Sequence, residues 1–329
     1  MRSLSAGEVA FAQRRHVAFL VLQVVRAVVL PVFPRLGSAQ IKVTRHGVGM
    51  ELRRADGGVI AVEVVGQPGA TPVLFCHGLA DSRLSAHSFA GAAHEFGLRL
   101  IAPDRPGMGR TNARRLNRVV DWVAEAILVL DALDVGSVAL LGVSGGGAFA
   151  AAARLRCPIA SEACCLSRHL AAYLPHPRDG GRAAHVLACG QTRPAFSGWF
   201  LGRLATVARR EPGLFLRLAT NEMPDIDRRT LARPDVREAF LTNYLRALHP
   251  PQLGSRARSA GADPALGFRD RVHHGTDVDR PRDADTTVPL QHARRFAEAI
   301  PGAQLQIHPG HGHFSILDAP VRTLATLAE

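Results

Sequence analysis

The stretch Gly142-Val143-Ser144-Gly145-Gly146 stands between an apolar run, residues 137–141, and a run of small residues, 148–153. The apolar run predicts a buried strand, and the alanine-rich run predicts a helix. A serine between them must occupy a tight, strained turn, and the flanking glycines remove side chains that would clash there. Such a turn raises the hydroxyl above the sheet and brings the N–H of Gly145 to the helix N-terminus. The stretch therefore predicts a nucleophile elbow with Ser144 as the candidate nucleophile.

A second motif lies upstream of the elbow. Residues 72–76 form an apolar run that predicts another buried strand, and His77-Gly78-Leu79 follows it directly. A glycine just after a central strand lets the chain turn back over the strand ends. This makes the backbone N–H of Leu79 the candidate partner of the Gly145 N–H in an oxyanion hole. An ordinary turn from strand to loop is the alternative interpretation.

The C-terminal region contains a candidate general base. Residues 303–307 alternate in polarity, which predicts a strand, and the glycine-rich loop 309–314 comes next. A histidine in such a loop can swing over the serine and take its proton. Two histidines compete, and the spacing assigns the role to His313 and leaves His311 as a loop residue.

The candidate acid is Asp285, which precedes His313 by 28 residues. It opens the segment 285–289, ahead of a predicted helix over 290–300. The order Ser…Asp…His along the chain is that of one known arrangement of the triad. The nearby alternatives for the acid are Asp277, Asp279 and Asp283.

Together these motifs resemble the α/β-hydrolase fold superfamily, and in particular bacterial members with a similar proline- and glycine-punctuated loop between the first motif and the elbow. In that loop, Asp104 and Arg105 are interpreted as structural. The resemblance extends from about residue 48 to the C-terminus. The matching segments are His77-Gly78, 103–111, 142–147, 285–289 and 310–313.

The resemblance implies a Ser–His–Asp triad, no cofactor and no metal, with hydrolysis of an ester, thioester, amide or C–C bond. A serine nucleophile argues against haloalkane dehalogenase and epoxide hydrolase chemistry, which use aspartate on this fold. We expect a serine hydrolase that cleaves a small or medium ester through an acyl-enzyme. The alternatives are a cofactor-free haloperoxidase-like enzyme or C–C bond hydrolase with the same triad, and a non-catalytic binding protein of this fold.

The alternation of strands and helices predicts an α/β fold with a mostly parallel, doubly wound sheet and a helical cap insertion. A hairpin over 43–54 and 59–66 opens the core, and further strands over 72–76 and 98–102 and a helix over 119–133 follow. The expected cap helices are 199–209, 212–219 and 235–248. The expected domains are an apolar or amphipathic N-terminal segment, 1–40; a core, 41–165 and 255–329; and a cap, 166–254.

The amino-acid composition limits the classes of partner that the protein is expected to bind. The chain has 329 residues, a net charge of +12 and an almost exclusively arginine-based positive charge, but its arginines are scattered and only two Trp and two Tyr are present. This pattern disfavours nucleic-acid binding and leaves a small-molecule substrate as the expected partner. Five cysteines without a C-x-x-C motif argue against a disulfide framework or a zinc site and fit a reducing compartment. Oligomeric state does not follow from the sequence.

The N-terminal apolar run, residues 17–33, is interrupted by Gln23 and Arg26. These polar groups disfavour a spanning helix and favour an amphipathic helix that packs on the fold or lies on a membrane surface. The expected location is the cytoplasm, with or without peripheral membrane contact. Secretion, with cleavage before Gln40, is the minority alternative.

Two stretches depart from the pattern, 154–194 and 254–284. Each occupies a place where an apolar strand is expected beside the site, and each is rich in charged residues, histidine, proline or glycine. Divergence is one interpretation, and a local reading-frame error in a GC-rich gene is another. Resequencing of the gene separates them.

Overall fold

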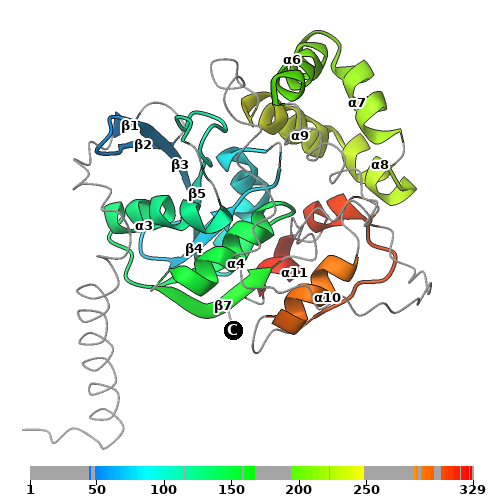
Figure 1. Cartoon of the computed structure of the whole chain (residues 1–329). Coiled ribbons are helices and arrows are strands. Elements are labelled where there is room, and N and C mark those ends of the chain that lie inside the picture. Colours follow the sequence, from blue (N-terminus) through cyan, green and yellow to red (C-terminus); the bar gives the residue numbers. More distant parts are fainter. Residues whose placement is uncertain are drawn as a thin grey trace, which may run out of the picture.

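The computed structural model describes residues 44–45, 49–166, 194–247, 285, 287, 290–299 and 305–327, apart from residues 80, 115, 117, 158, 222, 319 and 326. Within this part of the chain, a central sheet carries helices on both faces, and a group of further helices lies beyond one end of it (Figure 1). The α/β class predicted from the alternating pattern is confirmed.

Seven described strands form the sheet, in the order β1-β2-β3-β5-β4-β6-β7. The pairings from β1 through β3 to β5 are antiparallel, whereas β5, β4, β6 and β7 run parallel to one another. Central parallel strands are covered by helices on both faces and therefore read as continuous apolar runs, as β4 and β6 do. The strands are β1 (Thr44–Arg45), β2 (Met50–Arg53), β3 (Val59–Val65), β4 (Thr71–Cys76), β5 (Leu98–Pro103), β6 (Val138–Gly142) and β7 (Ala160–Leu166).

Helices on the two faces of the sheet enclose two separate hydrophobic cores. On one face, the 3-10 turn Val119–Trp122, α3 (Val123–Ala132) and α4 (Gly146–Arg156) pack together, and Trp122 meets Phe149 edge to face. On the other face lie the 3-10 helix Arg83–Phe89, α2 (Ala90–Glu95) and α11 (Pro320–Ala325). Small residues along α4 let it lie close to the sheet directly behind the elbow.

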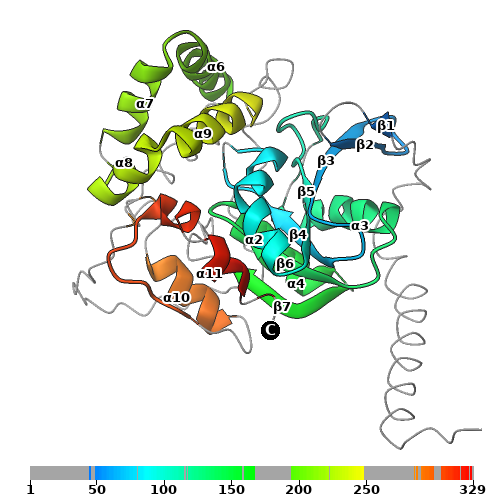
Figure 2. The same ribbon diagram turned by 180° about the vertical axis from the view of Figure 1, so that it is seen from behind.

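Four of the described helices form a cap above the carboxyl ends of the parallel strands (Figure 2). The rings of Phe215 and Tyr244, with centroids 4.6 Å apart, are the centre of its own small core. The predicted cap helices are confirmed, but α8 was not expected, because charged and polar residues dominate its sequence and hide any apolar period. The cap helices are α6 (Pro194–Arg210), α7 (Pro212–Thr220), α8 (Asp225–Ala232) and α9 (Pro234–Ala247).

The first irregular stretch contains a strand after all. β7 pairs parallel with β6, and it places Cys164 and Cys165 opposite Leu140 and Leu141, with one register shift along the pair. Ladder hydrogen bonds to a buried neighbour impose the extended conformation on a sequence that has little apolar periodicity of its own. Residues 167–193 and 248–284 lie outside the described part, so both predicted cap boundaries stay predictions.

The predicted strand over 303–307 is wrong for the residues described there. Residues 305–307 are not in a strand, and Leu305 and Ile307 are 38% and 40% exposed. In the described part of the sheet β7 is the last strand on its side, and residues 305–307 pair with none of the described strands. An isolated extended segment gains no stability from ladder bonds in the absence of a neighbour.

Two smaller helical elements complete the described fold around the C-terminal loop. α10 (Leu290–Ala299) follows the acid segment, as predicted, and the 3-10 helix His313–Leu317 begins at the candidate base. The predicted N-terminal helix, residues 17–33, lies outside the described residues. Among the residues described, no helix is both long enough and apolar enough to cross a bilayer.

Candidate active site

Ser144 occupies the turn between β6 and α4 with a φ of 51°, in the left-handed region. Such a φ is strained for a residue with a side chain and is typical of residues held for function. Gly146 permits the turn, because a Cβ there would collide with the carbonyl oxygens of Cys76 and His77 at the end of β4. The elbow is thus pressed against the neighbouring strand, and the serine hydroxyl lines a cavity.

Three side chains distant in sequence meet at this turn. Nε2 of His313 lies 3.1 Å from Oγ of Ser144, and Nδ1 of the same ring lies 3.0 Å from Oδ2 of Asp285. A carboxylate only accepts, so Nδ1 carries the proton and Nε2 is left to accept from the serine hydroxyl. The other carboxylate oxygen of Asp285 accepts from the N–H of Thr287 at 2.8 Å, which orients the acid.

The other candidates for the base and the acid are not found in the described part of the site. His311 is half-buried, and its Nδ1 lies 3.3 Å from the carbonyl oxygen of Pro309 in its own loop. The three other candidate acids, Asp277, Asp279 and Asp283, lie outside the described residues. Within the part described, Asp285 is the carboxylate at the histidine ring.

The two candidate oxyanion donors lie side by side. A Cβ on Gly145 would stand 3.1 Å from the backbone nitrogen of Leu79, so the two backbones approach closely beside Ser144. In the described part of the chain, neither N–H donates to another protein group. Gly145 is also the N-cap of α4, where the helix dipole adds partial positive charge.

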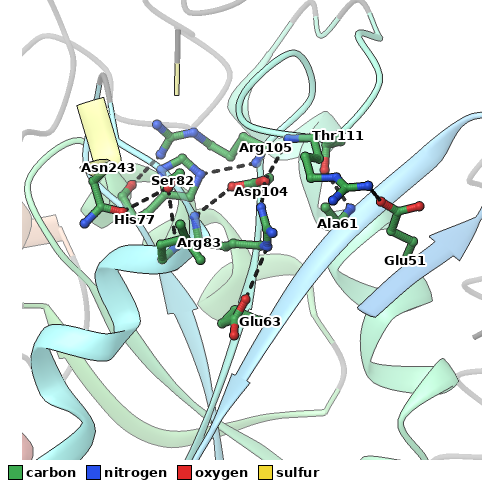
Figure 3. Close-up of polar contacts among 12 residues, drawn as sticks. Glu51, Ala61, Glu63, His77, Ser82, Arg83, Asp104, Arg105, Thr111 and Asn243 are labelled. Carbon is green, nitrogen blue, oxygen red and sulfur yellow. Dashed lines mark hydrogen bonds and ion pairs between the residues drawn. The ribbon is translucent and has the colours of Figure 1, made fainter. Parts of the chain in front are cut away.

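His77 and Arg105 hold the loop that carries Leu79 (Figure 3). The guanidinium of Arg105 donates to the carbonyl oxygens of His77 and Gly78, at 2.5 and 2.7 Å. Nε2 of His77 accepts the backbone N–H of Arg105 at 3.2 Å, so its Nδ1 is the protonated nitrogen and donates to Gly78. Burial, and then the charge of Arg105, hold the pKa of His77 well below its usual value. A neutral histidine anchored in this way is part of the scaffold.

Asp104 ties the same region to the sheet. Its carboxylate accepts from the backbone N–H and guanidinium of Arg83, at 2.7 and 2.8 Å, and from the backbone N–H of Arg110 at 3.0 Å. Figure 3 shows Arg83 between this carboxylate and that of Glu63 on β3. Burial raises the pKa of Asp104, while Arg83 opposes the rise. The network fixes the turn after β5 beside the turn after β4.

A cavity of about 300 Å³ opens over Ser144, His313 and the two candidate oxyanion donors. Its described lining is mostly apolar and comes from both core and cap, including Phe149, Phe240 and Tyr244. Burial raises the pKa of the Tyr244 hydroxyl to about 12, so the hydroxyl stays protonated. Among the cap aromatics, Phe240 and Tyr244 line the cavity, while Phe215 packs within the cap.

Sequence reasoning missed two polar residues of the cavity wall, Asp81 and Asn243. Asp81 accepts from the N–H of Ser82 at 2.8 Å, and Asn243 accepts from the Ser82 hydroxyl at 3.0 Å. Burial raises the pKa of Asp81 to about 6, although hydrogen bonds from Ser82, Ser85 and Gly78 act to lower it. The position of Asp81, three residues after Gly78 of the His-Gly motif, was a usable signal. Nothing local to Asn243 marked it.

A third missed residue is Asp227 of the cap helix α8, whose carboxylate accepts the backbone N–H groups of His313 and Phe314. The sequence carried no signal for Asp227, because no helix was expected between α7 and α9. For metals, the described residues include no cluster of three His, Cys, Asp or Glu side chains placed to hold an ion.

The chain belongs to the alpha/beta hydrolase family, whose model matches residues 73–327. A 2-hydroxymuconate semialdehyde hydrolase of Pseudomonas sp. (strain CF600) is 27% identical over 234 residues, which are 68% of this chain and 73% of the relative. A hydrolase of Pseudomonas aeruginosa PA01 has a similar structure, with a TM-score of 0.59 at 19% identity over 87% of this chain and 100% of that one. An esterase of Exiguobacterium antarcticum has a TM-score of 0.55 at 18% identity, with coverages of 85% and 99%. Family and relatives agree on a hydrolase.

Proposed function

We propose that this hydrolase is a serine esterase that forms an acyl-enzyme on Ser144. The observation that carries the proposal is the continuous chain of contacts from the Ser144 hydroxyl to His313 and on to Asp285, at 3.1 and 3.0 Å. This is the geometry of a nucleophile, its base and the group that orients the base. The adjoining amides of Leu79 and Gly145 supply a place for the developing negative charge.

The reaction follows from these positions. Oγ of Ser144 attacks the ester carbonyl while its proton passes to Nε2 of His313, and the carbonyl oxygen becomes an oxyanion held by the two amides. Collapse of the intermediate breaks the ester C–O bond, and the leaving alcohol takes the proton from Nε2. Water then attacks the acyl-enzyme by the same route, which releases the acid and restores Ser144. Asp285 stabilises the imidazolium that forms in each half of the cycle.

The cavity favours an uncharged, apolar ester of small or medium size. Its described lining contains no lysine or arginine and carries one carboxylate, Asp81. A bound anion would therefore lose its hydration without gaining a counter-charge from this wall. An apolar acyl or alcohol group would instead pack on Phe149, Phe240 and Tyr244.

A C–C bond hydrolase is the second candidate, because two curated relatives at 27% and 25% identity are named 2-hydroxymuconate semialdehyde hydrolase. The muconate part of that name denotes a carboxylic acid, which is an anion at neutral pH. The same triad serves either chemistry, so the charge of the preferred substrate separates the two. The described wall, with Asp81 and without a cation, supports the uncharged ester.

The test combines active-site labelling with turnover. We expect a fluorophosphonate to label the purified protein at Ser144, identified by mass spectrometry of the modified peptide, and p-nitrophenyl butyrate to be hydrolysed. Ser144→Ala should abolish both, while Ser137→Ala, which alters an exposed serine just before β6, should leave both intact. Labelling that persists in Ser144→Ala, or its absence from a folded wild-type protein, would refute the proposal. Faster cleavage of a muconate-type substrate than of any ester would select the C–C hydrolase.

A further inference from the structure

The cap contributes a buried carboxylate to the loop that holds the candidate base. Asp227 of α8 is fully buried, and its two oxygens are divided between consecutive amides. Oδ2 accepts from the N–H of His313 at 2.9 Å, and Oδ1 accepts from the N–H of Phe314 at 2.8 Å. Both bonds therefore restrain the backbone at the point where the His313 side chain leaves it.

The loop is shaped to receive this carboxylate. A Cβ on Gly312 would collide with all three terminal atoms of the Asp227 side chain, so the approach needs a glycine there. The amides belong to the first turn of the 3-10 helix His313–Leu317, which lacks acceptors of its own at that end. The glycine just before His313 is thus explained by a contact with the cap as well as by the turn.

Burial of the charged Asp227 side chain at this position is unfavourable in free energy. Burial raises its pKa, the two amide bonds lower it, and the nearby charge of Asp285 raises it further. A buried carboxylate is tolerated only where strong donors meet it. A hydroxyl or amide side chain could cap a short helix at smaller cost, so a simple capping role does not account for a charge at this position.

A second link joins the same two elements without contacting His313. Thr230 and Arg233, on and just after α8, donate to the two oxygens of Asp318 at 2.6 and 2.8 Å. Asp318 ends the 3-10 helix and its side chain is 37% exposed. Docking of the cap is therefore shared by two sets of contacts, and the set made by Asp227 is the one that also restrains the His313 backbone.

We propose that Asp227 is a positioning residue, through which the seated cap sets the ring of His313 between Ser144 and Asp285. This rests on the serine-hydrolase function proposed above. The core holds the ring through Asp285, and the cap holds the backbone through Asp227, so the triad reaches its working geometry only when the cap is seated. A shift of the backbone by a fraction of an ångström lengthens both ring contacts at once, and proton transfer is sensitive to such displacements.

The variant Asp227→Asn tests this in the full-length protein, with Asp318→Asn as the matched control. The amide retains one acceptor oxygen but presents an NH2 group to the second backbone N–H. We expect kcat for p-nitrophenyl butyrate to fall about 10- to 100-fold with little change in KM. Asp318→Asn should weaken the docking of the cap and lower the melting temperature. It should nevertheless leave kcat within about twofold of the wild-type value.

A readout independent of turnover is the downfield NMR signal of the His313 Nδ1 proton, which reports its bond to Asp285. We expect this signal in the wild type and in Asp318→Asn, and its loss or broadening in Asp227→Asn. An unchanged kcat and signal in Asp227→Asn would overturn the proposal, as would equal effects in both variants, which would indicate docking alone. If Asp227→Asn does not fold, Asp227→Glu takes its place in the same measurements, because it retains the charge and displaces the carboxylate by one methylene.

These outcomes are distinct from failure of the proposed function. A wild-type protein that neither turns over esters nor reacts with the fluorophosphonate would refute the esterase. The NMR signal would still show whether Asp227 holds the His313 ring against Asp285.

Discussion

Nε2 of His313 lies 3.1 Å from Oγ of Ser144, although the two residues are 169 positions apart in the sequence. Each partner is held independently. Ser144 is fixed by a strained turn between β6 and α4, and His313 is fixed by Asp285 at its ring and Asp227 at its backbone. The distance between them therefore reports on the packing of the elbow, the acid segment and the cap together.

Replacement of the acid tests its assignment. Asp285→Asn should lower kcat about 10³- to 10⁴-fold, because an amide at this position favours the wrong tautomer of His313. The measurement is kcat for p-nitrophenyl butyrate, with circular dichroism as a check on folding.

The matched controls are Asp277→Asn, Asp279→Asn and Asp283→Asn, which remove the other candidate acids one at a time. We expect each to retain most of the activity. A collapse of kcat in one of these variants, with Asp285→Asn nearly unaffected, would transfer the role of the acid.

Removal of the Arg105 guanidinium from beneath the loop that carries Leu79 should lower both stability and reactivity. Arg105→Leu leaves the carbonyl oxygens of His77 and Gly78 buried without their donor, at a cost of about 2–4 kcal/mol of unfolding free energy. Because the same loop carries Leu79, fluorophosphonate labelling of Ser144 should also slow.

Denaturant unfolding and labelling rates measure the two effects of Arg105→Leu. The control is Arg118→Leu, which removes an exposed ion pair with Asp121. Equal losses of stability in the two variants would show that the two buried hydrogen bonds of Arg105 stabilise the fold no more than an exposed ion pair does.

The raised pKa of Asp81 predicts how stability depends on pH. Its folded-state pKa, about 6, lies above the ordinary value of 3.8, so the folded protein binds the proton more tightly than the unfolded chain does. This contribution to stability is complete below about pH 4 and is lost as the pH rises through 6, a change of about 2–3 kcal/mol.

Asp81→Asn removes that dependence. We expect the free energy of unfolding of the variant, minus that of the wild type, to rise between about pH 4 and pH 6.5 and to be flat above. Denaturant unfolding at a series of pH values measures the difference. A constant difference over this range would show that Asp81 titrates normally. The slope is the test, since the amide also alters the contacts with Ser82 and Ser85.

Asp81 should also select substrates by charge. At pH 8 its carboxylate faces the cavity, so the wild type should cleave p-nitrophenyl butyrate faster than the mono-p-nitrophenyl ester of succinate, which adds one anionic group. A charge separation of about 10 Å at an effective dielectric of 20 corresponds to a factor of about ten in kcat/KM. Asp81→Asn should reduce this preference to near its value for spontaneous hydrolysis. An unchanged preference in the variant would place the source of selectivity elsewhere.

Local patterns were sufficient for much of this molecule. The elbow, the His-Gly turn and the paired apolar strands follow from short stretches whose conformation depends on neighbours in the sequence. The strand predicted over 303–307 is absent from its described residues, 305–307, for the opposite reason, because a strand is stable only where it pairs with another. β7 formed from an unpromising sequence because β6 offered it an edge.

The sequence by itself determined the elbow at Ser144 and the motif that carries Leu79, because glycine positions and apolar runs act over a few residues. It also supplied His313 and Asp285 as candidates among several. Only the tertiary structure decided which of the described residues meet, what pKa Asp81 acquires, and that a cap residue restrains the backbone of His313 from 86 positions away. Distance, burial and desolvation are properties of the packed chain, and no local pattern encodes them.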